Sequence, residues 1–390
     1  MFRVMITDAC YKNAIALARH LRRAIPDLYV VGHSVGGGHL AGWYRCFDTV
    51  IGNVPLGRAI ESQSFDIVIP VGGASVLTVA SRCPDRAVLP SPDILEACYD
   101  KSRTIVLAES AGVPTPKTNV VRRVEELSEI SITYPCVVKP AREASGLKSV
   151  AYCNNLTDLT AATADQLRCL DGRSAVLVQE FIEGQGCGLF ALMNHGVPLR
   201  VFMHQRIREF PPSGGPSTAA RSFYSDRLKA LGLRLLSTLG WHGVAMVEFR
   251  YSPAKRDFIL MEVNGKFWGS LELALSAGIN FGADLIRLFQ GEQLSYSETY
   301  DRDHEFYWPL DDDLLTLWCT RSLRRISDYW RPNAHTNLFQ SLRGDSLKSL
   351  RLAGKLATML LARKPFVAKS SRADAGPETC PGNQPSVANR

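Results

Sequence analysis

The stretch DFILMEVNGKFWGS (residues 257–270) carries the residues that decide the fold of this chain. Its first half has the alternation of a β-strand, which places four residues on one face: Phe258, Leu260, Glu262 and Asn264. A second apolar run, GVAMVEFRY (243–251), carries Glu248 near its end. We expect the two runs to be neighbouring strands, with their polar residues close together.

Two carboxylates and one amide at the ends of apolar strands indicate a bound cation. Burying an unpaired carboxylate is costly, so Glu248 and Glu262 need a positive partner. Mg²⁺ typically takes few protein carboxylates and completes its shell with substrate phosphates. For either acid alone, an arginine partner or exposure to solvent is the simpler explanation. Together with Asn264, the set favours a metal site.

Two further stretches carry weaker signals for a nucleotide. In YPCVVKPAREASGLKSV (134–150), Lys139 ends an apolar run and a loop with Ser145 and Gly146 follows. Backbone N–H groups of such a loop suit phosphate oxygens. AVLVQEFIEG (175–184) is a strand that runs into a glycine, and its backbone can pair with a purine edge. Taken singly, each is also explained as an ordinary strand end.

The order of these motifs resembles that of the ATP-grasp proteins over residues 100–290. It runs from a strand lysine before a glycine loop to Q-E-F-I-x-G, V-E-F and M-E-x-N-x-[KR]-F-W-G-S. The resemblance implies that ATP contacts the following residues: Lys101, Lys139, Ser145, Gly146, Glu180, Phe181, Ile182 and Glu183. It also implies Mg²⁺, with Mn²⁺ as a substitute, at three ligands: Glu248, Glu262 and Asn264.

The chain departs from the family pattern at two places. Gly265 and Lys266 stand where the family often has proline and arginine, and Lys266 keeps the charge but loses the planar fork of arginine. Cys187 stands where an acidic residue often contacts the ribose, which leaves Glu183 or Gln185 as substitutes.

A basic strand supplies further candidate catalytic residues. In HQRIREFPPSGGPSTAARSF (204–223), alternation places Arg206 and Arg208 on one strand face. Two guanidiniums suit a carboxylate or a transferring phosphoryl group. A solvated basic strand edge explains the pattern equally well. With Lys266, these two arginines are the candidate catalytic residues.

The pattern of predicted elements divides the chain. Short β-rich runs alternate with helical periodicity over residues 1–99, which predicts a Rossmann-like α/β domain. Residues 100–295 are mostly strands, which predicts an α+β region; by the resemblance this is the ATP-grasp domain, with a small lid at about 118–183. Residues 296–365 are helical and basic, and residues 366–390 have the polar, Pro/Gly-rich composition of a disordered tail.

One motif indicates a different enzyme class. VVGHSVGGGH (30–39) contains the G-x-S-x-G pattern of serine hydrolases, centred on Ser34. Too few residues precede Ser34 to build the earlier strands of that fold, and the glycines that follow begin a helix poorly. We predict that Ser34 is a loop residue and not a nucleophile.

Composition limits the partners and the compartment. The net charge of +7 over 390 residues suits small anions better than nucleic acid. Ten cysteines without C-x-x-C spacing indicate reduced thiols in the cytoplasm. No window has the length of a membrane span. The basic segment 346–369 is expected to be a helix packed on the core, with at most a weak, salt-sensitive membrane contact. The oligomeric state has no sequence signal.

The resemblance implies an ATP- and Mg-dependent ligase that joins a small-molecule carboxylate to an amine through an acyl phosphate. One alternative is a bicarbonate-activating enzyme, similar to a carboxylase or carbamoyl-phosphate synthase. The chain shows no biotin-carrier motif or glutaminase triad, which argues against it. Another alternative is a non-catalytic nucleotide-binding protein, and the retained set of Glu248, Glu262 and Asn264 argues against a dead site.

Overall fold

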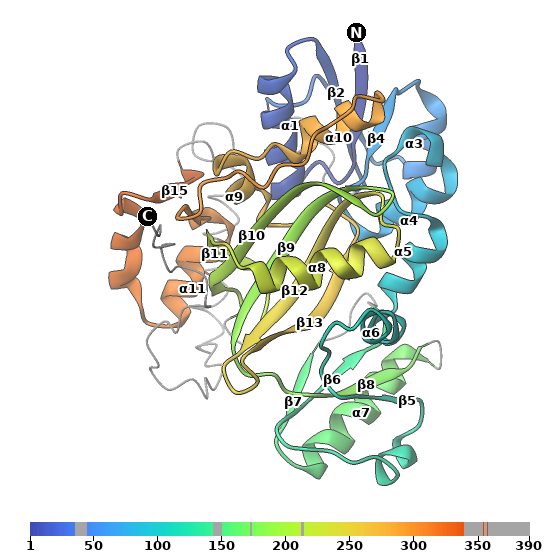
Figure 1. The fold of residues 1–390 in the computed structure, drawn as a ribbon, viewed down its shortest axis with the longest axis vertical. Coiled ribbons are helices and arrows are strands. Elements are labelled where there is room, and N and C mark those ends of the chain that lie inside the picture. Colours follow the sequence, from blue (N-terminus) through green and yellow to red (C-terminus); the bar gives the residue numbers. More distant parts are fainter. Residues whose placement is uncertain are drawn as a thin grey trace, which may run out of the picture.

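The computed structural model describes residues 1–338 except 36–44, 143–149, 172–173 and 212–213, together with Gly354 and Ala357. Within this part of the chain the strands form three sheets. Figure 1 shows the N-terminal domain at the top, a large twisted sheet in the middle and a small subdomain below. Ser145, Gly146 and the basic segment 346–369 fall largely outside the described residues.

The N-terminal domain is a parallel sheet with helices around it. Its strands have the order β3-β2-β1-β4. They are β1 (Phe2–Ile6), β2 (Leu28–Ser34), β3 (Thr49–Gly52) and β4 (Ile67–Ile69). The helices are α1 (Lys12–Ala24), α3 (Leu56–Ser62), α4 (Gly73–Arg82) and α5 (Pro92–Tyr99), and α6 (Lys101–Ser110) follows. The predicted Rossmann-like α/β architecture is confirmed.

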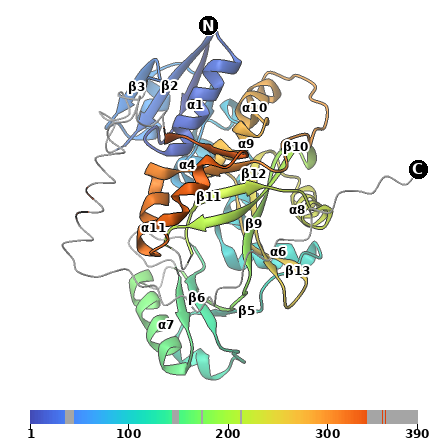
Figure 2. The ribbon, with the colours of Figure 1, turned by 90° about the vertical axis from the view of Figure 1, so that its left-hand side faces the viewer.

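The small subdomain is an antiparallel sheet covered by one long helix. Its strands are β5 (Thr118–Val121), β6 (Cys136–Pro140), β7 (Ala151–Cys153) and β8 (Val176–Glu180), in the order β5-β8-β6-β7. Helix α7 (Leu156–Leu170) packs on this sheet, and the two enclose their own apolar core. Figure 2 shows α7 on the outer side of this subdomain. The separate core lets the subdomain act as a unit.

The central sheet has seven strands in the order β13-β12-β9-β10-β11-β14-β15. They are β9 (Gln185–Asn194), β10 (Val197–Glu209), β11 (Ser217–Ser222), β12 (Gly243–Ser252), β13 (Asp257–Asn264), β14 (Glu305–Tyr307) and β15 (Ala334–Thr336). Neighbours are antiparallel except β14 and β15. Helix α8 (Asp226–Thr238) crosses one face of the sheet (Figure 1).

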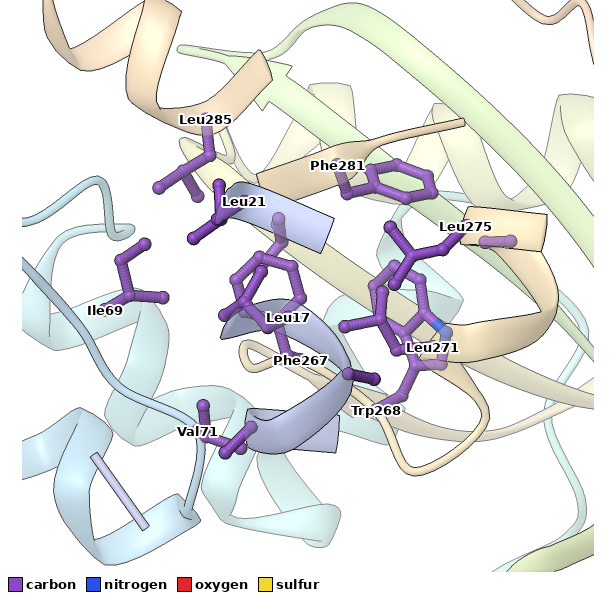
Figure 3. Close-up of a cluster of buried hydrophobic side chains, with 14 of the residues drawn as sticks. Leu17, Leu21, Ile69, Val71, Phe267, Trp268, Leu271, Leu275, Phe281 and Leu285 are labelled. Atoms are coloured by element: carbon purple, nitrogen blue, oxygen red, sulfur yellow. The ribbon is translucent and has the colours of Figure 1, made fainter. Parts of the chain in front are cut away.

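The opposite face of the central sheet packs against the N-terminal domain. Helices α9 (Leu271–Ser276) and α10 (Phe281–Phe289) lie between the two, and α1 packs on both helices. Figure 3 shows Leu17 and Leu21 of α1 beside Phe267 and Trp268, all at most 3% exposed. The contact is so close that a Cβ on Gly282 would lie 2.3 Å from Leu17 Cδ1. This core joins the N-terminal domain to the central sheet.

The C-terminal part combines strands with short helices. Residues 296–365 were expected to be helical, but the described part also contributes β14 and β15 to the central sheet. The segment EFY of β14 pairs with β11 and is buried, in line with the preference of aromatic residues for strands. Between the strands lie the turn η3 (Pro309–Asp313), helix α11 (Leu314–Cys319) and the 3₁₀ segment η4 (Leu323–Trp330). No helix among the described residues combines the length and apolarity needed to cross a membrane.

Candidate active site

A cleft of about 930 Å³ lies between the N-terminal domain and the central sheet. The N-terminal domain contributes two segments to its wall, Cys10–Asn13 and Val71–Gly73. The central sheet and the loop after β13 contribute Arg206, Ser217, Thr218, Met246, Glu248, Glu262, Asn264 and Lys266–Ser270. The C-terminal part contributes Leu310, Asp311 and Asp312. Four predicted site residues from the central sheet and Lys266 therefore meet in one cleft.

The two glutamates stand directly opposite each other. Glu248 on β12 pairs with Glu262 on β13, and Met246 pairs with Asn264 two residues further on. The ladder shifts register here, since Phe249 pairs with Leu260 and leaves Met261 as an extra residue. Such a bulge re-aims the side chains that follow it.

This bulge corrects the predicted strand face. Phe258, Leu260, Glu262 and Asn264 were expected to share one face. Phe258 and Leu260 instead lie in the apolar core on the α8 side of the sheet, while Glu262 and Asn264 line the cleft. The extra residue reverses the alternation, so the apolar half of β13 stays in the core and its polar end reaches the site.

An arginine lies against this pair of glutamates. Arg206 Nη2 is 2.7 Å from Glu248 Oε2, and Nη1 donates to Glu209 Oε2 at 3.2 Å and to the Gly215 carbonyl oxygen at 3.1 Å. Burial raises the pKa of Glu248, the Arg206 guanidinium opposes that rise, and the Glu262 carboxylate adds to it. The site therefore holds more negative charge than one arginine balances.

Lys139 brings a buried cation to the same carboxylates. Lys139 is the second-to-last residue of β6 and is 9% exposed. Burial, and after it the charge of Lys101, lower the pKa of Lys139, while Glu262 and Glu248 oppose the shift, and the net result is a pKa of about 8. In the part of the chain that the structure describes, its amino group makes no hydrogen bond or ion pair. A buried ammonium of this kind suits an anionic ligand.

The segment expected to receive adenine begins on the strand beside Lys139. Glu180 ends β8, and its carboxylate pairs with Lys255 Nζ at 2.7 Å while its N–H donates to the Lys117 carbonyl. Phe181 packs edge-on against Tyr152, and Ile182 is 5% exposed. Since the Glu180 N–H is already bonded, the N–H groups of Phe181 and Ile182 are the backbone donors that this segment can offer a purine.

Cys187 and its two possible substitutes, Glu183 and Gln185, differ in their surroundings. Cys187 lies in the core of the central sheet, with its Sγ near the Gln185 and Phe249 carbonyls, so its thiol does not face a nucleotide. Gln185 Nε2 donates to the Arg206 carbonyl oxygen at 2.9 Å. Glu183 is exposed. Of the two candidates, Glu183 has the side chain directed to solvent.

Lys266 reaches from the central sheet to the N-terminal domain. A Cβ on Gly73 would lie 3.5 Å from Lys266 Nζ and 3.4 Å from the ring of Tyr99. The amino group of Lys266, which belongs to the loop after β13, therefore lies near the first turn of α4.

Arg208 does not join Arg206, which corrects the expectation of two guanidiniums on one face. The β10–β11 ladder shifts register between the two arginines. Arg208 points to the C-terminal part and pairs with Asp313 at 2.7 Å and Asp328 at 2.9 Å. Among the cleft residues only Arg206 remains as a candidate from this pair.

Ser34 is the last residue of β2 and not the loop residue that was expected. Its side chain is buried, and its hydroxyl donates to Cys10 Sγ at 3.6 Å. The neighbouring His33 has its Nε2 2.8 Å from the Val54 carbonyl oxygen. Only β1 precedes β2 along the chain, whereas the serine of a hydrolase fold follows earlier strands that also build its oxyanion loop.

The residues at the carboxylate pair fit a magnesium ion. No group of three or more His, Cys, Asp or Glu that could hold a metal occurs in the described ranges. Two facing carboxylates with Asn264 beside them are, however, what Mg²⁺ needs when phosphates supply its other ligands. Like charges opposite each other in an antiparallel pair are destabilising, which a shared cation would relieve.

Comparisons with known proteins place this fold. No protein-family model matches the chain. Over 185 residues it is 27% identical to the vancomycin/teicoplanin A-type resistance protein VanA of Enterococcus faecium, covering 43% of this chain and 52% of that protein. Over 202 residues it is 26% identical to a D-alanine--D-alanine ligase of Chelativorans sp., covering 47% of this chain and 65% of the ligase. The chain thus spans less than two thirds of the length of these curated relatives.

Solved structures agree over more of the chain. An L-amino acid ligase from Bacillus licheniformis superposes with a TM-score of 0.63 at 17% identity, covering 78% of this chain and 79% of that one. A biotin carboxylase from Campylobacter jejuni superposes with a TM-score of 0.64 at 15% identity, covering 78% and 74%. The chain has the ATP-grasp fold, which the order of its motifs predicted.

Several residues of the cleft carried no sequence signal. Lys12, Thr218, Asp311 and Asp312 come from three distant parts of the chain. Their spacing follows no motif, because the fold and not the local sequence brings them together. Glu209, the second carboxylate that contacts Arg206, also carried no sequence signal, because residues three apart on a regular strand point to opposite faces and β10 departs from that regularity between them.

Proposed function

We propose that the chain is an ATP- and Mg²⁺-dependent ligase that joins a small-molecule carboxylate to an amine and releases ADP and phosphate. The observation that carries the proposal is the facing pair Glu248 and Glu262, with the buried ammonium of Lys139 near enough to interact electrostatically with both. Two of the matched proteins are ligases by name, one for D-alanine and one for L-amino acids. This supports carbon–nitrogen bond formation over other ATP-grasp reactions.

In this proposal the cationic residues hold the nucleotide. Lys139 and Lys101 bind phosphate oxygens, and Ser145 and Gly146 are the further ATP contacts that we propose. Glu180, Phe181 and Ile182 receive the adenine, with Glu183 as the ribose contact. Because Lys139 is buried beside two carboxylates, its charge acts at short range on the phosphates.

Glu248, Glu262 and Asn264 would hold the Mg²⁺ ions, and Mn²⁺ is the substitute we propose for them. Bound Mg²⁺ neutralises phosphate charge during phosphoryl transfer. Arg206 lies 2.7 Å from Glu248, and its guanidinium would balance the charge of a developing acyl phosphate. Lys266, across the cleft at α4, would orient the substrate carboxylate.

The bicarbonate-activating alternative has one observation in its favour, which is the fold shared with a biotin carboxylase. Fold alone does not set the substrate, and the curated relatives favour the ligase. Hydroxylamine separates the two. A ligase converts its acyl phosphate to a hydroxamate in the presence of ATP, Mg²⁺ and the right acid. ADP release without hydroxamate from any active carboxylate would contradict the ligase and favour bicarbonate or direct phosphorylation.

We also propose a cytoplasmic protein whose partners are small molecules and not nucleic acid. Nine cysteines in the described part of the chain are free thiols, and most are buried. Reduced thiols of this number are typical of a reducing compartment. A fractionation experiment that found the protein outside the cytoplasm would contradict this.

A further inference from the structure

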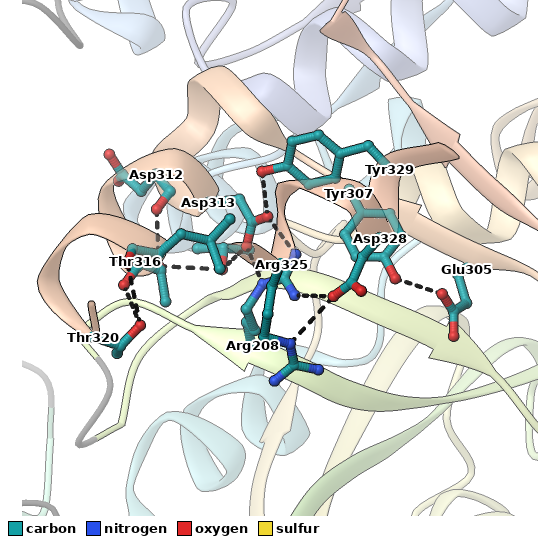
Figure 4. Close-up of polar contacts among 12 residues, drawn as sticks. Arg208, Glu305, Tyr307, Asp312, Asp313, Thr316, Thr320, Arg325, Asp328 and Tyr329 are labelled. Atoms are coloured by element: carbon teal, nitrogen blue, oxygen red, sulfur yellow. Dashed lines mark hydrogen bonds and ion pairs between the residues drawn. The ribbon is translucent and has the colours of Figure 1, made fainter. Parts of the chain in front are cut away.

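Arg208 is a buried charged residue that does not line the cleft. It is the one sequence-predicted catalytic residue that the cleft does not use, yet its side chain is only 6% exposed. Its guanidinium donates from Nε and Nη2 to the two oxygens of Asp313, at 2.8 and 2.7 Å, and from Nη1 to Asp328 at 2.9 Å. Figure 4 shows this arginine between the two carboxylates. A bidentate pair of this kind fixes geometry as well as charge.

Asp313 is the centre of the network and is fully buried. Besides Arg208, it accepts a hydrogen bond from Thr218 Oγ1 at 2.9 Å and another from the Tyr329 hydroxyl at 2.7 Å. Thr218 is itself a residue of the cleft wall. The carboxylate of Asp313 therefore connects the strand that carries Arg208 to the cleft surface.

Asp313 also ends the turn η3, which forms the third wall of the cleft. Leu310, Asp311 and Asp312 of this turn line the cleft together with the proposed metal ligands. Asp312 has a φ of +80°, a conformation that non-glycine residues adopt only when the surroundings hold it. Thr316 Oγ1 donates to the Asp312 carbonyl oxygen at 2.8 Å, and Asn337 Nδ2 donates to Asp311 at 3.2 Å. The turn is thus held by hydrogen bonds at three consecutive residues, 311–313.

The bulge in β10 explains how one strand serves both sites. The β10–β11 ladder skips a residue between Arg206 and Arg208, so the two side chains find different partners. Arg206 contacts the glutamates at the proposed reacting centre, and Arg208 contacts the base of the third wall. A displacement of β10 at this point would move both.

We propose that Arg208 is a positioning residue: through Asp313 it holds Thr218 and the turn η3 as the substrate-facing wall of the cleft. The expected change in substrate KM rests on the proposed ligase function. The expected change in the mobility of η3 does not. Arg208 touches neither the cleft nor the nucleotide residues. Its effect should therefore appear in the binding of the acid or amine substrate and not in the binding of ATP.

Arg208→Lys tests this without removing the charge. Lysine keeps one ammonium near the two aspartates but cannot donate a planar fork to both. The matched control is Arg325→Lys, because Arg325 also contacts Asp328, at 3.3 Å, but is about half exposed and makes no contact with Asp313. Both variants are compared as full-length proteins. Thr218→Val serves as a second variant if Arg208→Lys folds poorly. It replaces the hydroxyl that donates to Asp313 with a methyl group of similar size.

Two measurements decide the proposal. Hydrogen exchange should accelerate in residues 309–313 and 217–218 of Arg208→Lys, but not in β12, β13 or the small subdomain, and Arg325→Lys should match the unmodified protein. In the ADP-release assay, the KM of the acid or the amine should rise about tenfold or more, as small misplacements of positioning groups can cause, while the KM of ATP stays constant.

A purely structural role gives a different result, namely a lower apparent kcat with unchanged KM values, and that result would overturn the proposal. Exchange in residues 309–313 at the unmodified rate would overturn it as well. If no acid and amine support ADP release even in the unmodified protein, the ligase function fails separately. The exchange measurement then decides alone whether Arg208 holds the wall.

Discussion

Glu248 and Glu262 face each other across two antiparallel strands, on the side of the central sheet that forms the cleft. Arg206 contacts Glu248 from β10, and the charge of Lys139 acts on both glutamates from the small subdomain. Like charges in this position are destabilising, so the sheet carries them at a cost in stability. Three elements that are distant in the sequence thus converge on one pair of carboxylates.

The first prediction concerns Glu262. We expect Glu262→Gln to abolish ADP formation while the thermal midpoint stays equal or rises, because the change removes charge repulsion but little volume. Each charge-assisted contact contributes about 1.5–3 kcal/mol, and a cation bound between two carboxylates depends on both. Coupled ADP assays and a thermal melt measure the two effects. The control is Glu292→Gln, an exposed glutamate paired with Arg287, which should keep full activity. Full turnover by folded Glu262→Gln would exclude this residue as a metal ligand.

The second prediction is a pH dependence that arises from Lys139. The pKa of Lys139 is lowered to about 8, chiefly by burial, so the folded protein loses this positive charge as the pH rises through that value. We therefore expect Mg-ATP to bind well below pH 8 and progressively more weakly above it. Direct titration of Mg-ATP binding between about pH 6.5 and 9.5 measures this. Most of the loss in affinity should fall within about one pH unit of the midpoint.

Lys139→Arg is the matched control for that profile. Arginine stays charged over the whole range, so the fall above pH 8 should disappear even if the affinity differs. Lys139→Met should bind Mg-ATP weakly at every pH. A fall of unchanged size in Lys139→Arg would assign the pH dependence to another group.

The third prediction concerns the contact between the N-terminal domain and the central sheet. A Cβ on Gly282 would lie 2.3 Å from Leu17 Cδ1, so Gly282→Ala must displace a core side chain. Overpacking of this kind costs about 1–3 kcal/mol of unfolding free energy. Gly57→Ala in α3 is the control, since its Cβ would meet nothing closer than 3.9 Å, and alanine favours the helix by about 0.5–1 kcal/mol. Denaturant titrations should give opposite signs for the two variants. Equal stability of Gly282→Ala and the unmodified protein would mean that this interface is loosely packed.

Much of the site could be predicted because it lies on regular strands. Glu248, Glu262 and Asn264 were expected to lie close together, and they line one cleft. The expectation was possible because each of the two apolar runs has its polar residues near its end. Their assignment as metal ligands stays a prediction. The bulge at Met261 could not be predicted, because an extra residue in one strand is defined only by its pairing with the other. The same reason separates Arg206 from Arg208, which regular alternation had joined.

By itself, the sequence determined the order of the motifs, the parallel N-terminal domain and the antiparallel region that follows. These depend on local periodicity and on residues close to one another in the chain. Only the tertiary structure decided which side chains enter the cleft, how Arg208 and Asp313 hold its third wall, and that β14 and β15 extend the central sheet. Arg208 and Asp313 are 105 positions apart, and the free energy of such a contact exists only after the apolar core has brought the segments together.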